Sequence, residues 1–409
     1  MIKILVIGSG FGGIYSVKSL LKKFKNKEDI DITLISKQNY FLFTPLLHEV
    51  ATGTIATKNV IEPIREIIKS SNFHFIEAEV NKIDFNKKLV FYDNKRIDYD
   101  YLIIAIGAKA NYYGIKEAEK YTTNLKTIND AINIKNRIIN ALEKASKTQH
   151  KDWLNFIVVG GGPTGVELIA EMYDFVSQAL ERNYKKLEMN KVNFYLIQKD
   201  NSLIPLFNEK TRNNTIKKLK EKNIKVLTST QVTKVAKDYV ETNNKDKIYA
   251  KTIIWTSGVT PNKIEAIPKE VLHPSSHFKV NEFLEIEKTK DAFAIGDCAL
   301  FFNKGTIKPI PALAQVAVSQ AKHVVKNIKL KIENKKLQSY KFIPEGYLLS
   351  IGYGYATGNV GNFTISGFFA WWLWRTIYLF KLIGLTNKLK VAFDWTINLI
   401  TRRRDTTKI

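Results

Sequence analysis

The chain has 409 residues, of which 45% are hydrophobic and 25% are charged, the composition of an ordinary globular protein with room for two or three domains. Sixty-three Lys and Arg residues outnumber 39 Asp and Glu residues, which gives a formal net charge of +24. The single cysteine excludes a thiol redox pair, an intramolecular disulfide and a four-cysteine iron–sulfur site. Because the lysines are scattered and no nucleic-acid motif is present, we expect a solvated basic surface or attraction to anionic lipid, with no nucleic-acid partner and no metal site.

The first elements form a β-α-β unit. An apolar strand over residues 2–7 leads into the glycine turn Gly8–Gly13 and a helix to about Lys23, and a second strand covers residues 31–36. Such glycines permit a tight turn and let the backbone approach a pyrophosphate at the helix N-terminus. The first strand follows the initial Met with neither a secretory signal nor an Arg-rich leader, so we expect a cytoplasmic chain.

The same pattern returns after about 150 residues. Residues 155–159 predict a strand, Gly160–Gly165 a second glycine turn, and a helix begins around Val166 before a strand over residues 192–198. One GxGxxG motif is weak evidence, but two, each between a strand and a helix, predict two separate dinucleotide-binding sites.

Further buried strands end in glycine at Gly107 and Gly258. Another apolar strand leads to Gly296-Asp297, and a helix is predicted from Pro311 to about residue 330. Four of the six tryptophans lie in the last 60 or so residues, which sets that region apart. The fold class that these elements predict is α/β, with two Rossmann-like domains and a C-terminal amphipathic-helix region.

Neither β-α-β unit has the acidic residue that commonly holds a ribose 2′-hydroxyl at the end of the second strand. Ser36 and Lys37 stand there in the first unit, and Gln198 and Lys199 in the second. A serine or a glutamine can still bond a hydroxyl, and Lys199 would attract a 2′-phosphate. We hypothesise that the second site accepts NADPH as well as NADH.

The two units and the motif at Asp297 resemble the two-dinucleotide-binding flavoprotein superfamily. The single cysteine rules out its disulfide reductase and sulfide:quinone oxidoreductase branches. Residues 39–53, 162–168 and 314–317 are similar to signatures of the type II NADH:quinone oxidoreductases, and the resemblance extends from residue 1 to the C-terminal tail.

The resemblance implies a peripheral-membrane flavoenzyme that transfers a hydride from NADH, or alternatively NADPH, to FAD and then two electrons to a membrane quinone, without proton pumping. It implies a homodimer on the cytoplasmic face of a bacterial inner membrane. A soluble ferredoxin- or rubredoxin-type reductase and a non-catalytic NAD(P)H-sensing flavoprotein are the alternatives. The expected FAD-binding domain has two parts, residues 1–110 and residues 281–335. The expected NAD(P)H-binding domain covers residues 111–280, and a membrane-association region covers residues 336–409.

By resemblance, Glu167 lies between the nicotinamide and the flavin and serves NADH binding and proton delivery; alternatively, it is a carboxylate stabilised by a helix N-terminus. Gln315 borders the flavin and the quinone entrance, with a capping amide as the alternative. The predicted catalytic residues are Glu167 and Gln315. The predicted cofactor-binding residues are Gly8, Gly10, Phe11, Gly12, Gly13, Ser36, Lys37, Thr44, Pro45, Leu46, Val80, Ala105, Gly107, Gly160, Gly162, Pro163, Thr164, Gly165, Gln198, Gly258, Gly296, Asp297, Ala314 and Gln315.

Two positions depart from the family pattern. Ser319, with Gln320 beside it, stands where a second glutamine is common, and Glu345 precedes Gly346 where many members have lysine. The first departure bears on quinone hydrogen bonding and the second on the electrostatics of the flavin. The sequence leaves open the choice between ubiquinone and menaquinone and the oligomeric state.

The C-terminal region carries two apolar stretches. Residues 366–385 contain Arg375 and Lys381, which argues against a spanning helix. Residues 388–404 predict an amphipathic helix that lies in the plane of the lipid headgroups, or alternatively one that packs on the core or a dimer interface. Deletion of residues 366–409 is expected to release an active protein from the membrane. The polar stripe of the helix is Lys390, Asp394, Asn398 and Thr401, its apolar face is Ala392, Phe393, Trp395, Leu399 and Ile400, and Arg402–Arg404 form its basic end.

Overall fold

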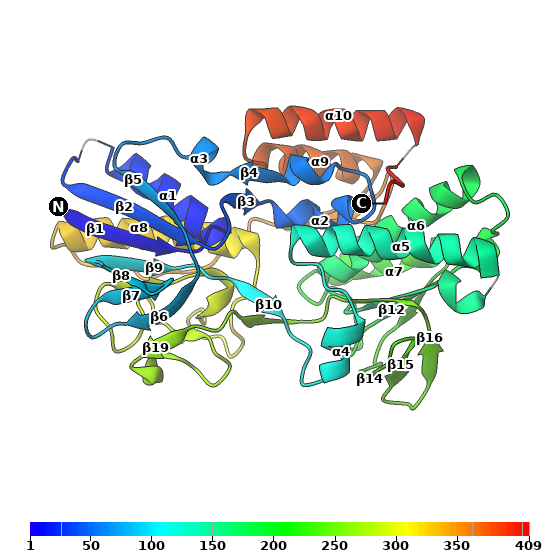
Figure 1. The fold of residues 1–409 in the computed structure, drawn as a ribbon, viewed down its shortest axis with the longest axis horizontal. Coiled ribbons are helices and arrows are strands. Elements are labelled where there is room, and N and C mark those ends of the chain that lie inside the picture. The colour runs from blue at the N-terminus through cyan, green and yellow to red at the C-terminus, as the bar shows by residue number, and fades with distance from the viewer. Residues whose placement is uncertain (26, 149, 362, 403, 409) are drawn as a thin grey trace. The chain divides into compact units, whose positions relative to one another are not determined.

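The computed structural model describes residues 1–25, 27–148, 150–361, 363–402 and 404–408. The chain divides into two compact units, each assembled from segments that are distant in sequence (Figure 1). The first unit comprises residues 1–41, 62–109 and 259–344, and the second comprises residues 42–61, 110–258 and 345–409.

The first unit is built around a five-stranded parallel sheet. Its strands are apolar runs, the pattern of strands that are buried on both faces. In the centre, Val6 pairs with Leu34 on one side and Ile103 on the other, and all three side chains are fully buried. The strand order is β21 (Ala292–Ala294), β9 (Tyr101–Ile104), β1 (Ile2–Ile7), β2 (Ile30–Ser36) and β5 (Phe73–Glu77).

Two helices of the first unit pack against each other, α1 (Phe11–Lys23) and α8 (Ala314–Ile332). The buried face of α1 repeats at helical spacing, with Ile14, Val17 and Leu20 inside. The unit also contains α3 (Ile64–Ile67), a sheet of β19 (Glu265–Ile267), β6 (Val80–Asp84), β7 (Leu89–Tyr92) and β8 (Lys95–Asp98), and the pair β20 (Phe278–Lys279) and β22 (Ala299–Leu300).

The second unit repeats the parallel β-α-β arrangement. Its four-stranded sheet has the order β13 (Ile224–Leu227), β12 (Asn193–Ile197), β11 (Asn155–Val159) and β17 (Thr252–Trp255). The helix after β11 is α6 (Pro163–Arg182). It begins three residues before the predicted Val166, because Gly162 serves as the N-cap and proline is tolerated in the first turn, where its missing N–H costs nothing.

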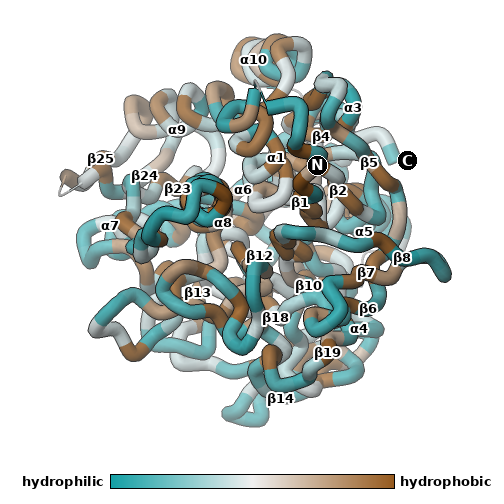
Figure 2. The backbone as a smooth tube through the Cα atoms, turned by 90° about the vertical axis from the view of Figure 1, so that its left-hand side faces the viewer, coloured by the Kyte–Doolittle hydropathy of each residue, from teal (hydrophilic) through white to brown (hydrophobic). Residues whose placement is uncertain are grey.

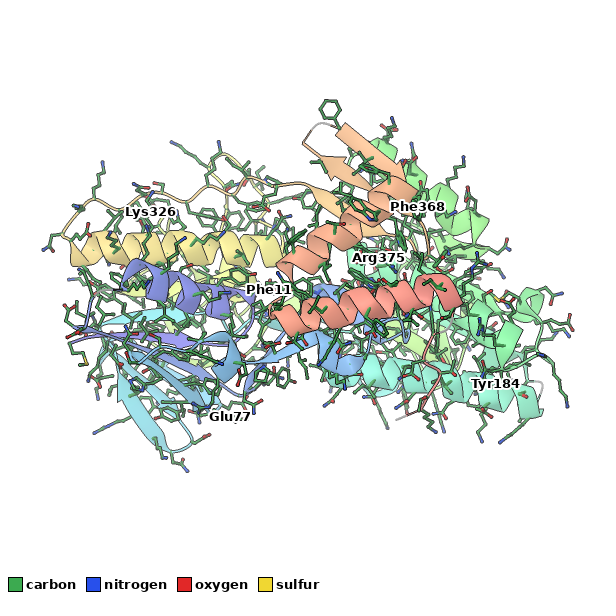
Figure 3. All side chains as sticks on the ribbon, turned by 90° about the horizontal axis from the view of Figure 1, so that it is seen from above. Phe11, Glu77, Tyr184, Lys326, Phe368 and Arg375 are labelled. Carbon is green, nitrogen blue, oxygen red and sulfur yellow. The ribbon has the colours of Figure 1, made fainter. Side chains whose placement is uncertain are left out.

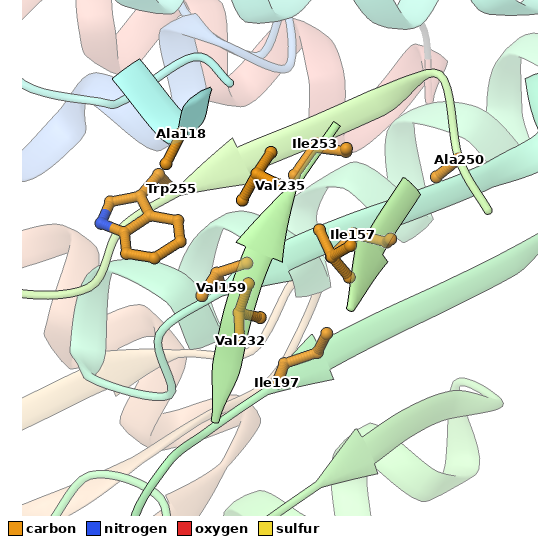
Figure 4. Packing of buried hydrophobic residues seen from close by; sticks show 10 residues of the cluster. Ala118, Ile157, Val159, Ile197, Val232, Val235, Ala250, Ile253 and Trp255 are labelled. Carbon is orange, nitrogen blue, oxygen red and sulfur yellow. The ribbon is translucent and has the colours of Figure 1, made fainter. Parts of the chain in front are cut away.

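A hydrophobic cluster joins this parallel sheet to a three-stranded antiparallel sheet of β14 (Val232–Val235), β15 (Tyr239–Thr242) and β16 (Lys247–Tyr249) (Figure 4). Val159, Ile197 and Ile253 project from the parallel sheet, and Val232 and Val235 meet them from the antiparallel sheet. Each such side chain contributes about 1.5–3 kcal/mol when buried. This packing fixes the strand from which the second glycine turn leaves.

The remaining helices of the second unit include the short α2 (Leu47–Val50), which packs on α5 (Ile128–Thr148) and α6. The 3₁₀ helices η1 (Thr44–Leu46) and η2 (Thr57–Val60) flank α2. The helices α4 (Lys116–Tyr121) and α7 (Glu209–Glu221) also belong to this unit, and the chain has four further short strands, β3 (Tyr40–Leu42), β4 (Ile61–Pro63), β10 (Ala108–Ala110) and β18 (Val259–Pro261).

The C-terminal region also belongs to the second unit. It consists of an antiparallel sheet, β23 (Tyr347–Ser350), β24 (Ala356–Val360) and β25 (Phe363–Gly367), followed by helices α9 (Phe368–Lys381) and α10 (Leu385–Thr401). The two helices lie side by side, and both carry many hydrophobic positions (Figures 1 and 2). Among the helices of the described residues, none is long and apolar enough to span a bilayer.

The helix over residues 388–404 presents two residues of its predicted polar stripe to the protein. Asp394 Oδ2 accepts a hydrogen bond from Asn59 Nδ2 at 2.7 Å, and Asn398 Nδ2 donates to the Thr54 carbonyl at 2.7 Å. Asp394 and Asn398 therefore face the protein, because these side chains find hydrogen-bond partners there, whereas Lys390 and Thr401 of the same stripe are exposed.

The exposed side of α9 and α10 is apolar. Trp395, predicted on the outward face, is 5% exposed, whereas Leu385 and Ile400 are each 74% exposed. We call the large exposed side chains of the two helices the outward apolar face: Phe368, Phe369, Trp372, Phe380, Leu385, Leu389, Phe393, Ile397, Leu399 and Ile400.

The compact units follow different boundaries from the predicted domains. Residues 42–61 lie in the second unit, and the chain returns to the first unit at residue 259 rather than 281. Residues 345–409 are part of the second unit, whereas the sequence suggested a separate region. The assignment of functional domains to these segments stays a prediction.

Candidate active site

The first glycine turn is constrained at two positions and open at a third. Gly8 has φ +99°, and a Cβ on Gly13 would lie 1.7 Å from the Gly8 carbonyl oxygen. By contrast, a Cβ on Gly10, the N-cap of α1, would meet nothing within 4 Å. The turn therefore cannot accept side chains inside, and it leaves space in front of the first N–H groups of the helix, where a phosphate binds.

The second glycine turn reproduces these three features. Gly160 has φ +114°, and a Cβ on Gly165 would lie 1.9 Å from the Gly160 carbonyl oxygen. A Cβ on Gly162, the N-cap of α6, would again meet nothing within 4 Å. Pro163 and Thr164 form the first turn of the helix. Both turns thus have the geometry that a dinucleotide pyrophosphate requires.

The end of β2, in the first unit, carries one of a pair of neighbouring hydroxyl groups. Ser36 is buried and its Oγ lies 2.8 Å from Ser9 Oγ. Lys37 is exposed, and its ammonium group lies 3.4 Å from Glu79. Ser9 and Glu79 were not among the predicted site residues. Ser9 is inside the glycine motif, so its position could have been used.

In the second unit, a carboxylate lies close to the end of β12, at a position that the sequence pattern did not predict. Gln198 Oε1 accepts a hydrogen bond from the Gly161 N–H at 2.7 Å, and Gln198 Nε2 donates to Asp200 Oδ2 at 2.8 Å. The glutamine therefore joins the glycine turn to an acidic residue two positions later. The end of the strand itself lacks an acid, as the sequence indicates, and the nearest carboxylate in this network is that of Asp200.

The segment around Asp297 forms the 3₁₀ helix η6 (Gly296–Cys298). Gly296 has φ +68°, and its N–H donates to Gln320 Oε1 at 2.7 Å. Gln320 is 1% exposed, so the glutamine beside Ser319 holds the Gly-Asp turn in place. Burial raises the pKa of the Cys298 thiol to about 12, which keeps it protonated and unreactive.

The other predicted cofactor residues of the first unit lie near its strand and helix ends. Ala314 and Gln315 begin α8, and Phe11 begins α1, with its ring centroid 5.1 Å from that of Phe41. Val80 opens β6, whereas Ala105 and Gly107 follow β9, and a Cβ on Gly12 would lie 3.1 Å from the Ala105 Cβ.

In the second unit, Thr44, Pro45 and Leu46 make up η1, and Gly258 follows β17 with φ +72°. Asp297 of the first unit is not a helix cap, because Ile295 takes the N-cap position of η6.

Glu167 lies in the second turn of α6, and its carboxyl group is buried. Ser350 donates its backbone N–H to Glu167 Oε1 at 3.2 Å. Burial raises the pKa of Glu167 well above its usual value, the Ser350 N–H opposes this, and Glu49 raises the pKa further. Burial at this position therefore favours the neutral form of the Glu167 carboxyl group.

Other buried ionisable groups of the second unit lie near Glu167. Glu49 Oε2 accepts the indole N–H of Trp395 at 2.6 Å, and Glu171 Oε2 lies 2.7 Å from Arg404 Nη2. Arg375 lies on α9 (Figure 3). Its guanidinium lies 3.8 Å from the ring centroid of Trp371 on the same helix. We call Glu49, Glu167, Glu171, Arg375 and Arg404 the buried charge cluster.

One of these cations, Arg404, differs from the sequence-based expectation. The pattern predicts Arg404 in a basic helix end facing lipid, but its side chain is 5% exposed and paired with Glu171. Arg375, which interrupts the first apolar stretch, is half-buried and interacts electrostatically with Glu49 and Glu171. Arg403 lies outside the described residues. Burial of this kind does not follow from local periodicity, because the partners lie more than 200 residues away in the chain.

The comparisons with known proteins agree with this architecture. The profile of the pyridine nucleotide-disulphide oxidoreductase family matches residues 2–321, and the NDH2 C-terminal domain matches residues 345–404. A probable NADH dehydrogenase of Dictyostelium discoideum is 32% identical over 98% of this chain and 90% of its own length. A type II NADH:quinone oxidoreductase of Staphylococcus saprophyticus is 28% identical over 94% of this chain and 96% of its own. The chain belongs to the type II NADH:quinone oxidoreductase family.

The fold supports the same family assignment. NDH2 from Plasmodium falciparum, solved in complex with NADH, matches with a TM-score of 0.88 at 26% identity, over 99% of both chains. The predicted family, fold class and type of enzyme of this NADH:quinone oxidoreductase are thereby confirmed. The roles of its individual site residues stay predictions.

Proposed function

We propose that this chain oxidises NADH and reduces a membrane quinone through a bound FAD, without proton pumping. The main support for the proposal is the duplicated glycine turn, one for each dinucleotide, within a chain of the type II family. The overall reaction, NADH + H⁺ + quinone giving NAD⁺ + quinol, takes one proton from outside the nicotinamide.

The residues of the first unit fit FAD. The open position at Gly10 leaves room for a pyrophosphate at the N-terminus of α1, and the Ser9–Ser36 hydroxyl pair stands at the strand end where a ribose is held. We propose Asp297 and Gln315 as further contacts of the cofactor. When bound, FAD accepts a hydride from NADH and supplies two electrons to the quinone.

The residues of the second unit fit NADH in preference to NADPH. Gln198 joins Gly161 to Asp200, so a carboxylate stands beside the strand end that faces the ribose in this type of site. That carboxylate would accept a bond from a 2′-hydroxyl and repel a 2′-phosphate. We therefore propose NADH as the preferred substrate, in contrast to the expectation based on Lys199.

We propose that Glu167 delivers the proton that quinol formation requires. It is buried, it accepts the Ser350 N–H, and burial raises its pKa well above the usual value, which favours the protonated form. A neutral carboxyl group can donate a proton where an ionised one cannot.

The outward apolar face supports peripheral binding to a membrane. Its ten large apolar side chains are exposed on α9 and α10; Lys381 ends α9, and Lys388 and Lys390 lie in the first two turns of α10. Exposed apolar patches of this kind mark interaction sites, and lysine is attracted to anionic lipid. We propose that the chain binds the cytoplasmic face of an anionic membrane, such as the bacterial inner membrane, through both helices.

We also propose that the chain forms a homodimer. A second copy would bury part of the outward apolar face and leave the rest for lipid. Sedimentation of the detergent-solubilised holoenzyme tests this, and a monomer at micromolar concentration would contradict it.

The alternative functions have less support. A soluble ferredoxin- or rubredoxin-type reductase does not account for the match to the NDH2 C-terminal domain. A non-catalytic sensor would reduce its flavin once. Steady-state oxidation of NADH by the holoenzyme with a short-chain quinone tests the proposed function: repeated turnover supports it, and a single equivalent of NADH consumed contradicts it.

A further inference from the structure

The buried charge cluster contains more acids than bases. Three carboxyl groups, Glu49, Glu167 and Glu171, face two guanidinium groups, Arg375 and Arg404. Arginine remains charged in proteins, and an uncompensated buried charge is strongly unfavourable. The cluster is therefore electrically balanced when one of its three carboxyl groups holds a proton.

The other titratable groups around the cluster do not change this balance. His48 is neutral, because burial lowers its pKa to about 4. Lys135 of α5 is paired with Asp405 at 2.8 Å.

A further ion pair lies along α6. Asp174 is paired with Lys222. Because each of these pairs contains one acid and one base, neither adds a net charge.

The three carboxyl groups are not equivalent. Burial would raise the pKa of Glu171, but Arg404 and the other cations outweigh this and lower it, so Glu171 is ionised. Glu167 has no cation among the groups that principally act on it. Glu171, in contact with Arg404, is thus the carboxyl group that the cations favour as an anion, and Glu167 is the one whose neutral form burial favours.

The charge on Glu49 bears on which carboxyl group of the cluster is protonated. Its Oε2 accepts the Trp395 N–H at 2.6 Å, and its Oε1 is buried with no hydrogen-bond partner in the part of the chain that the structure describes. Burial raises the pKa of Glu49 to about 7, while Arg375 lowers it and Glu171 raises it. At neutral pH and above, Glu49 therefore becomes the anion that balances Arg375.

We propose that Glu49 is a positioning residue that keeps the proton on Glu167, because its carboxylate completes the charge balance of the buried cluster. This inference rests on the proposed role of Glu167 as the proton donor for quinol formation. When Glu49 is ionised, two anions match the two arginines, and ionisation of Glu167 would add an uncompensated charge. When Glu49 is replaced by a neutral group, ionisation of Glu167 becomes the way to balance Arg375.

The test uses the Glu49→Gln variant of the holoenzyme. Glutamine has nearly the same shape and can still accept the Trp395 N–H, but it cannot carry a charge. We measure the two half-reactions separately by rapid mixing: flavin reduction by NADH, and flavin reoxidation by a short-chain quinone as a function of pH.

We expect the reduction rate to stay within about twofold of wild type, since that step takes no proton from the cluster. We expect the alkaline limb of the reoxidation profile to move to lower pH, by about one pH unit, because the loss of a neighbouring negative charge lowers the pKa of Glu167.

A compensating variant separates this effect from structural damage. The double variant Glu49→Gln/Arg404→Gln removes one acid and one base, which leaves Glu167, Glu171 and Arg375 and again requires one proton. We expect the alkaline limb to return toward its wild-type position, although the double variant is less stable. Glu49→Asp retains the negative charge, so its alkaline limb should also lie near the wild-type position. Glu285→Gln, which removes a carboxylate paired with Lys331 in the first unit, should leave the profile unchanged.

Infrared spectroscopy supplies a readout that is independent of turnover. The carbonyl stretch of a neutral buried carboxylic acid, assigned to Glu167 by its loss in Glu167→Gln, should disappear at lower pH in Glu49→Gln than in wild type. An unshifted profile and an unshifted band in folded Glu49→Gln would overturn the inference. Failure of wild-type enzyme to be reoxidised by quinone would instead overturn the proposed function.

Discussion

Trp395 of α10 donates its indole N–H to the carboxylate of Glu49 at 2.6 Å, so a helix with an exposed apolar side is bonded to the buried charge cluster. Asp394 on the same helix bonds Asn59, and Arg404 beyond the helix pairs with Glu171. The C-terminal region is thus an integral part of the second unit. Removing residues 366–409 would strip Glu49 and Glu171 of their partners, so such a deletion is expected to unfold the unit rather than release an active protein.

Replacing Trp395 with Phe should destabilise the protein by about 1–3 kcal/mol, because a hydrogen bond to a buried charged group is lost. Urea denaturation of the holoenzyme measures this. Thr396→Ala, on the exposed side of the same helix, is the matched control and should change the free energy of unfolding by less than about 0.5 kcal/mol. Equal effects of the two substitutions would contradict the bonding of Trp395 to Glu49.

The free energy of unfolding of Glu167→Gln should rise relative to that of wild type as the pH rises. The pKa of Glu167 is raised in the folded state, mainly by burial, whereas in the unfolded chain it is about 4.3. The stability that Glu167 contributes is therefore fully present below about pH 4 and is lost as the pH rises toward the folded pKa, at about 1.4 kcal/mol for every pH unit between the two pKa values.

Unfolding free energies at pH 5 and pH 8 measure this difference. The gap between Glu167→Gln and wild type should be larger at pH 8. If the difference in unfolding free energy between the variant and wild type is the same at pH 5 and pH 8, Glu167 is ionised in the folded protein.

The two glycines at the start of α6 should differ in their response to alanine. Gly162→Ala meets no atom within 4 Å, so it should leave stability unchanged but raise the KM for NADH about tenfold, because a methyl group enters the pyrophosphate space. Gly165→Ala places a Cβ 1.9 Å from the Gly160 carbonyl oxygen and should lower the melting temperature of the second unit. Calorimetry and steady-state kinetics distinguish the two, and equal melting temperatures would count against the turn geometry.

Asp200→Asn should reduce the preference for NADH over NADPH by about tenfold, because it removes a charge that repels a 2′-phosphate and keeps a side chain that can bond Gln198. The ratio of kcat/KM for the two substrates measures the effect. Asp238→Asn, which removes an acid paired with Lys251 elsewhere in the unit, should leave the ratio unaltered. An unchanged ratio in Asp200→Asn would place the ribose away from this carboxylate.

Leu389→Glu combined with Phe393→Glu should weaken binding to vesicles that contain phosphatidylglycerol by about 100-fold, since both side chains are more than half exposed on the outward apolar face. Vesicle flotation is the assay. Thr396→Glu adds one negative charge to an exposed polar position of the same helix and should reduce binding far less. Full binding by the double variant would move the membrane contact away from α10.

The two glycine turns and the strands around them were predictable because their determinants are local. The tight contacts at Gly13 and Gly165 are made with residues only five positions earlier in the chain. Family membership was also predictable from short motifs, and the comparisons confirm it.

The contacts that α10 makes within the second unit were not predictable in this way. The periodicity of the helix defines two faces, but it does not say which face packs on the protein, and Asp394 meets Asn59 across 335 residues of sequence. The pairing of Arg404 with Glu171 and the burial of Glu49 depend on tertiary packing for the same reason. Asp200 was missed because it stands two residues beyond the strand end that the motif specifies.

The most direct test of the proposed reaction follows the flavin absorbance of the anaerobic holoenzyme in sequential mixing, first with NADH and then with a short-chain quinone. We predict that NADH bleaches the flavin, that quinone restores its absorbance, and that excess NADH drives repeated cycles with one quinol formed for each NADH consumed. A flavin that is bleached by NADH but is not reoxidised by quinone would contradict the proposed reaction.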